Sequence, residues 1–214
     1  MKKLFLFLIA ITIFNLTFTS EIFACACCAE RGEYRISTSK PSDYDIDLLS
    51  QMKYSESAEL YTNEAGFDAI KGLNSIKKGY EDFDWSSSND YFSLTNSFAA
   101  KTWKFTFKTK DGKNGVLTLP MPTQMVEFAT DTHENEGTAE PVLYKEWRFK
   151  GTVQSGNGFF SAGIAKPTTY FLVLQGRGNN CNNAEDFSHW RLEINGKKAN
   201  YAFFGKMNTS EAAE

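Results

Sequence analysis

The sequence predicts a mostly β fold, an antiparallel β-sandwich or barrel of roughly eight to ten strands with one short helix. Aromatic residues, which favour strands, are abundant, with 19 Phe, 9 Tyr and 4 Trp in 214 residues. Several short segments alternate apolar and polar residues. Two pairs of these segments are joined by glycine-containing turns, and no strand–helix alternation typical of a parallel sheet is visible.

The clearest strand prediction covers residues 103–108. Trp103, Phe105 and Phe107 fall on every second position and therefore share one face. The turn 111–115 follows, where glycines are expected to supply positive φ angles, and 116–119 returns as the second strand of a hairpin.

A second hairpin is predicted near the end of the chain. Trp190, Leu192 and Ile194 alternate with charged residues, Asn195-Gly196 is typical of a turn, and 201–203 form the returning strand.

Between the hairpins, residues 142–153 and 168–175 predict two longer strands. The segment 168–175 is apolar on both faces, which favours a central strand covered on both sides.

A helix is expected at 65–77 from apolar residues spaced by three. Weaker strand patterns occupy 34–38, 44–49, 58–62 and 91–98.

The start of the chain has the pattern of a secretory signal peptide. Lys2 and Lys3 precede the uncharged apolar run 4–14, which is shorter than the roughly 20 residues that span a membrane. We therefore expect residues 1–24 to be a signal peptide and 25–214 to be a single β-rich domain. The protein is then secreted or periplasmic.

Three outcomes are open at the end of this signal. Small residues permit cleavage after Ala24 or after Ala26. The segment 22–25 also resembles the lipobox of bacterial lipoproteins, which implies acylation of Cys25 and a membrane anchor there. Cleavage after Ala26 would remove Cys25 and leave one of three cysteines unpaired. Four cysteines can all pair, which favours cleavage at or before Ala24.

The cysteines are concentrated where the predicted domain begins. In an oxidising compartment Cys25, Cys27, Cys28 and Cys181 are expected to form disulfides that tie the start of the domain to the loop 176–183. A bond between Cys27 and Cys28 is the least favourable, because adjacent residues strain the disulfide geometry. The alternative is a soft-metal site in which thiolates are joined by His189, Met121 or Met125.

The loop 176–183 is rich in Gly and Asn. As a binding rim it would offer Arg177 to an anionic group, with Asn179, Asn180 and Asn182 as hydrogen-bond partners of a ligand. The competing interpretation is that these asparagines make turns.

Nothing in the sequence singles out a catalytic residue or implies a cofactor. Ser188 and His189 are neighbours in a predicted strand, so their side chains are expected on opposite faces. Net charge is −3 with scattered charges, which argues against nucleic acid as a partner.

These patterns predict a non-catalytic binding module for a small-molecule or carbohydrate ligand, or for another envelope protein. An envelope metal-binding protein that uses the cysteines is the alternative. A hydrolase working through carboxylates such as Glu185 and Asp186 is third.

Overall fold

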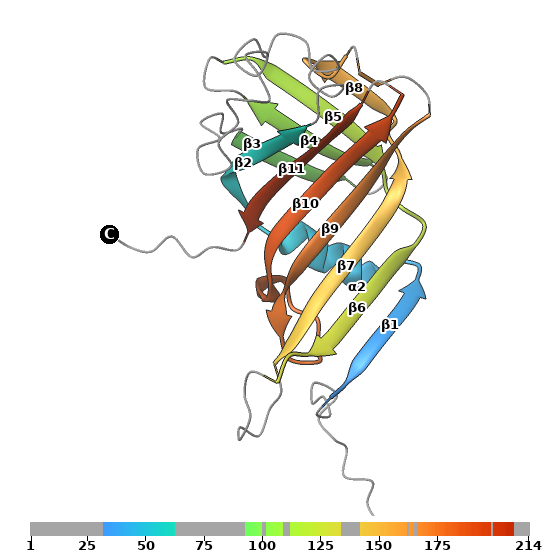
Figure 1. Cartoon of the computed structure of the whole chain (residues 1–214), viewed down its shortest axis with the longest axis vertical. Helices are drawn as coiled ribbons and strands as arrows, with labels where there is room; N and C mark the ends of the chain where they lie inside the picture. The colour runs from blue at the N-terminus through green and yellow to red at the C-terminus, as the bar shows by residue number, and fades with distance from the viewer. Residues whose placement is uncertain are drawn as a thin grey trace, which may run out of the picture.

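The protein, seen here as a computed structural model, is a sandwich of two antiparallel sheets (Figure 1). The structure describes residues 32–62, 93–99, 102–108, 112–133, 142–161, 163–164, 167–197 and 199–207. At 56–57, 59–62 and 93–99 it describes the backbone alone. The predicted class of fold is confirmed as a sandwich rather than a closed barrel.

The larger sheet has seven strands in the order β1-β6-β7-β9-β10-β11-β2, and every neighbouring pair is antiparallel. In chain order its strands are β1 (Tyr34–Ser39), β2 (Tyr54–Thr62), β6 (Met125–Asp131), β7 (Leu143–Thr152), β9 (Thr168–Gly178), β10 (Phe187–Gly196) and β11 (Asn200–Met207).

The smaller sheet has four strands in the order β3-β4-β5-β8 and covers one end of the larger sheet (Figure 1). Its strands are β3 (Ser93–Ala99), β4 (Thr102–Lys108), β5 (Asn114–Pro120) and β8 (Ser155–Gly158). A 3-10 turn, η3 (Ala184–Asp186), precedes β10.

Both predicted hairpins are present. Strands β4 and β5 pair antiparallel, and Gly112 between them has a φ of 83°, a value that glycine adopts readily. In the second hairpin Gly196 belongs to β10 and does not have a positive φ. The turn follows Gly196 instead of being formed by Asn195 and Gly196, and it is closed by hydrogen bonds between the backbones of Gly196 and Ala199.

The segment 44–49 is helical, not a strand. Helix α2 (Asp43–Gln51) begins at Ser42, whose hydroxyl accepts a hydrogen bond from the Asp45 backbone N–H, while the Asp45 carboxylate accepts one from the Ser42 N–H. This reciprocal cap stabilises the first turn. Buried residues recur with helical spacing at Asp45, Leu48, Leu49 and Met52, and this pattern prevails over the alternation that predicted a strand. The helix predicted at 65–77 lies outside the described residues.

The core lies between the two sheets and is built largely from aromatic rings. Trp103 of β4 packs edge-on against Phe149 of β7, with ring centroids 5.1 Å apart. Phe107 stacks on Phe203 of β11 at 4.1 Å. These contacts confirm the predicted inward face of β4, whose residues Trp103, Phe105 and Phe107 are all buried.

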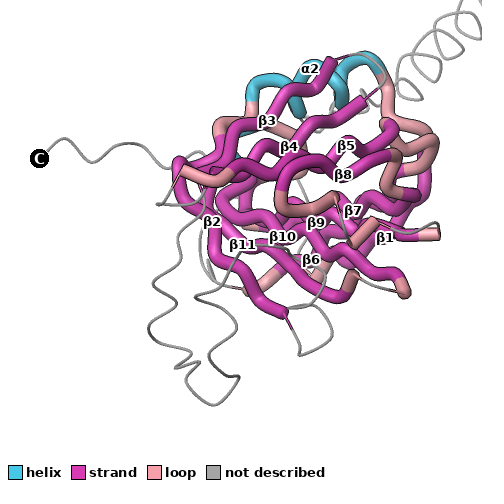
Figure 2. The backbone as a smooth tube through the Cα atoms, turned by 90° about the horizontal axis from the view of Figure 1, so that it is seen from above, coloured by secondary structure: helices cyan, strands magenta, loops and turns pink. Residues whose placement is uncertain are grey.

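The smaller sheet and α2 lie on the same side of the larger sheet (Figure 2). Among the described residues no helix or strand covers the opposite side, which we call the outer face. An antiparallel sheet tolerates this because its strands alternate between a buried and a solvated face. None of the described helices is long and apolar enough to cross a membrane.

Candidate functional site

The outer face presents an ordered array of aromatic and charged side chains. Strand β9 lies at the centre of the larger sheet, as predicted, with Tyr170, Leu172 and Leu174 buried against the core. Its alternate residues, including Phe171 and Val173, point outward. The prediction of a second covering layer is not met by the described elements. Val173 is nevertheless buried, and its cross-strand neighbours on this face are Arg148 and Arg191.

One row of aromatic rings crosses the edge of this face. Tyr34 of β1 packs edge-on against Phe128 of β6, with centroids 5.4 Å apart, and Phe128 meets Tyr144 of β7 at 6.2 Å. The guanidinium of Arg148 lies 5.0 Å from the centre of the Phe128 ring. Tyr34 is 65% exposed, so this row is open to solvent.

A network of hydrogen bonds holds the polar groups of β7 in place. The Tyr144 hydroxyl donates to the Glu146 carboxylate, which also accepts from Arg148. Burial, reinforced by this hydrogen bond to Glu146, raises the pKa of Tyr144 to about 12. Tyr144 is therefore a neutral hydrogen-bond donor at physiological pH.

A second group of side chains is centred on Phe171. In the strand register Lys150 of β7 and Glu193 of β10 are both direct cross-strand neighbours of Phe171. The Lys150 ammonium lies 4.9 Å and the Arg191 guanidinium 5.9 Å from the centre of the Phe171 ring. Arg191 also pairs with Glu193 at 2.9 Å.

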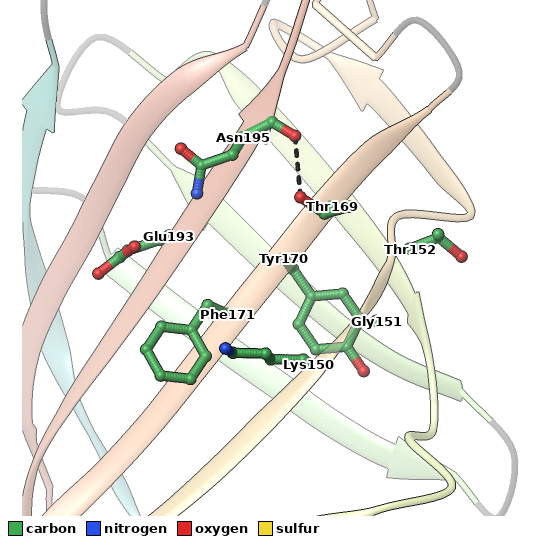
Figure 3. Close-up of a pocket in the computed structure, with 8 residues that line it drawn as sticks. All are labelled: Lys150, Gly151, Thr152, Thr169, Tyr170, Phe171, Glu193 and Asn195. Carbon is green, nitrogen blue, oxygen red and sulfur yellow. Dashed lines mark hydrogen bonds between the residues drawn. The ribbon is translucent and has the colours of Figure 1, made fainter.

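A shallow pocket of about 690 Å³ opens beside this group (Figure 3). This volume falls within the range of small-ligand sites. A second cross-strand row, Thr152, Thr169 and Asn195, adds hydroxyl and amide groups, and the Thr169 hydroxyl donates to the Asn195 carbonyl at 3.2 Å. The lining residues are Lys150, Gly151, Thr152, Thr169, Tyr170, Phe171, Glu193 and Asn195.

The Tyr170 ring packs closely over Gly151 at this pocket. A Cβ at Gly151 would lie 2.6 Å from the Tyr170 ring, so a side chain there would displace the ring. The Tyr170 hydroxyl donates to the Pro120 carbonyl of β5 at 2.9 Å, and burial raises the pKa of Tyr170 above its usual value. Tyr170 thus ties the pocket to the smaller sheet.

The loop predicted as a ligand rim lies elsewhere and makes contacts within the protein. Arg177 is exposed on the outer face opposite Tyr144 of β7. The Asn179 side chain accepts a hydrogen bond from the Cys181 N–H at 3.0 Å. The backbone carbonyls of Asn180 and Asn182 accept hydrogen bonds from Arg35 and Tyr44, and these contacts anchor the loop to β1 and α2.

Beneath this loop lies a buried cation that the sequence analysis did not identify. Lys145 is 2% exposed, and its ammonium donates to the Cys181 carbonyl and, at 2.7 Å, to the Asp186 carboxylate. Burial lowers the pKa of Lys145, against the opposite effect of Asp186. The sequence contained a signal for this burial, because Lys145 lies two residues before Trp147 and therefore on the same inward face of the strand.

Cys181 is disulfide-bonded. Its expected partners, Cys25, Cys27 and Cys28, lie outside the described residues, so the pairing stays a prediction. No group of three or more His, Cys, Asp or Glu within the described ranges is arranged to hold a metal ion.

Ser188 and His189 differ from the prediction. The Ser188 hydroxyl and His189 Nδ1 lie 2.9 Å apart, within hydrogen-bond distance. The pairing of β10 with β9 shifts register between Phe187 and His189, and this irregularity breaks the strict alternation of faces. Within the described part of the chain no carboxylate is bonded to the His189 ring, so the arrangement lacks the third, orienting member of a catalytic triad.

Comparison with known proteins returned no match: the chain resembles no protein-family model, no curated protein and no solved structure.

Proposed function

We propose that this protein is an exported, non-catalytic binding module that holds a carbohydrate in the outer-face pocket beside Phe171. The observation that carries the proposal is the pocket itself, in which one partly exposed aromatic ring is surrounded by hydroxyl, amide and charged groups. Pockets of this kind combine an apolar contact with a few polar groups that orient the ligand.

A sugar ring matches both parts of this pocket. Its C–H face is apolar and suits the flat ring of Phe171, whereas its hydroxyls both donate and accept hydrogen bonds. Thr152, Thr169 and Asn195 supply such partners within the same pocket. A purely apolar ligand would leave these polar groups without partners, at a cost in binding free energy.

Export is the second part of the proposal, and it is supported by the sequence of residues 1–24. The intact mass of the protein recovered from the culture medium or periplasm tests it. We expect the mass of residues 25–214, rising by four hydrogens on reduction as two disulfides open. A mass that includes residues 1–24 would contradict export, and an added acyl chain on Cys25 would identify the lipoprotein form.

Binding is tested with an array of defined oligosaccharides followed by calorimetric titration of the best ligand. We expect Phe171→Ala to weaken binding about fivefold to thirtyfold, because the lost aromatic contact contributes about 1–2 kcal/mol.

Phe128→Ala is the matched control, since it removes the same ring from the same face two strands away. It should leave the affinity unchanged within about twofold. Equal losses in both variants would contradict a site at Phe171, and an array without any bound sugar would overturn the proposed function.

A further inference from the structure

We infer that the carbohydrate is acidic, and that Lys150 binds its carboxylate or sulfate group next to the Phe171 ring. This inference rests on the proposed function and specifies the class of ligand for the same pocket.

The first support is the charge of the outer face. Strand alternation places five cationic residues and two anionic ones among the described side chains of this face, a balance of +3 on a chain whose net charge is −3. A surface of one sign attracts ligands of the opposite sign. The cationic residues are Arg148, Lys150, Arg177, Arg191 and Lys206, and the anionic ones are Glu146 and Glu193.

The second support is how these charges pair. Glu146 is bound to Arg148, and Glu193 is bound to Arg191. Both acidic side chains that the structure describes on this face are therefore engaged. Lys150 has no carboxylate partner among the described residues, and its ammonium rests against Phe171 at the pocket.

Lys150 is suited to an anion that reaches this pocket. An aromatic ring compensates only part of the charge of a cation that lies over its face. An acidic group adds a charge-assisted hydrogen bond to the same cation. In Figure 3 the Lys150 ammonium points toward the Phe171 ring, so a sugar stacked on that ring brings its substituents within reach of Lys150.

An acidic oligosaccharide fits this face better than nucleic acid does. Nucleic-acid affinity comes from many phosphates neutralised by cations along a track. Here Arg148 and Arg191 are already paired with glutamates, and the pocket offers hydroxyl and amide groups from Thr152, Thr169 and Asn195.

The experiment compares neutral, uronate-containing and sulfated oligosaccharides on one array, with a single-stranded DNA of similar length as a further probe. We expect binding only to acidic sugars, weakening as salt is raised. In calorimetric titrations with the best acidic sugar, Lys150→Met should lower the affinity about tenfold. Lys206→Met, which removes an exposed outer-face lysine on β11, should change it less than twofold.

The outcomes separate the two proposals. Binding of neutral sugars as tightly as acidic ones would overturn the inference and leave the binding function intact. Equal losses from Lys150→Met and Lys206→Met, or DNA bound as tightly as the sugar, would also overturn it. Absence of any bound sugar would overturn the proposed function, and the inference with it.

Discussion

Lys145 shows how a single residue holds the loop 179–186 against the larger sheet. It is the one fully buried cation among the described residues, and its ammonium joins the Cys181 carbonyl to the Asp186 carboxylate. A buried ion pair contributes little net stability compared with apolar residues of the same size, but removing one partner leaves the other charge uncompensated.

We therefore expect Lys145→Met to lower the free energy of unfolding by about 3 kcal/mol, because Asp186 loses its cation. Urea denaturation followed by tryptophan fluorescence measures this change. Lys150→Met is the control, since Lys150 is exposed and its loss should cost less than about 0.5 kcal/mol. Adding Asp186→Asn to Lys145→Met should restore part of the loss. A Lys145→Met protein as stable as the parent would disprove this role.

At the scale of elements, the strands with a regular alternation of apolar and polar residues were predictable, whereas strands β6 and β8 and helix α2 were not. Strand β4 carries its apolar residues at every second position, and the same residues are buried in the structure. In the segment 43–51 alternation at Tyr44, Ile46 and Leu48 resembles a strand as well. The cap between Ser42 and Asp45 decides in favour of a helix, and a short cap is weaker evidence in a sequence than a repeated pattern.

The candidate pocket could not be predicted, because it depends on strand register. Lys150, Phe171 and Glu193 lie in three segments of the chain, and only the pairing of β7, β9 and β10 places them in one row. The only local signal was Phe171 itself, an apolar residue on the second face of its strand. We interpreted it as evidence of a second covering layer, whereas the described elements leave that face uncovered.

The asparagine loop at 176–183 had two interpretations between which the sequence does not decide. Its composition is typical of both ligand rims and turns, and a sequence does not distinguish these. In the structure Asn179 accepts a hydrogen bond from the backbone of Cys181, and the loop carbonyls accept hydrogen bonds from Arg35 and Tyr44. Its described contacts are therefore those of a loop anchored to the domain.

At the scale of the whole molecule, the two faces of the larger sheet have different roles. One face is packed against the smaller sheet and α2 and supplies the core (Figure 2). The outer face carries the aromatic rows, the paired ions and the pocket. The net charge of the whole chain conceals this division. The alternation of side chains along each strand places most of the described charged residues of the outer face on the cationic side of the balance, and this is visible only once the strands are assigned.

The most direct test of the central claim is a map of backbone amide shifts by NMR as the best oligosaccharide is added. We predict that the largest shifts fall in three separate segments, 150–152, 169–171 and 193–195, because these form the pocket on adjacent strands. The largest shifts falling instead in the loop 176–183, with the three strand segments unchanged, would contradict the assignment of the site.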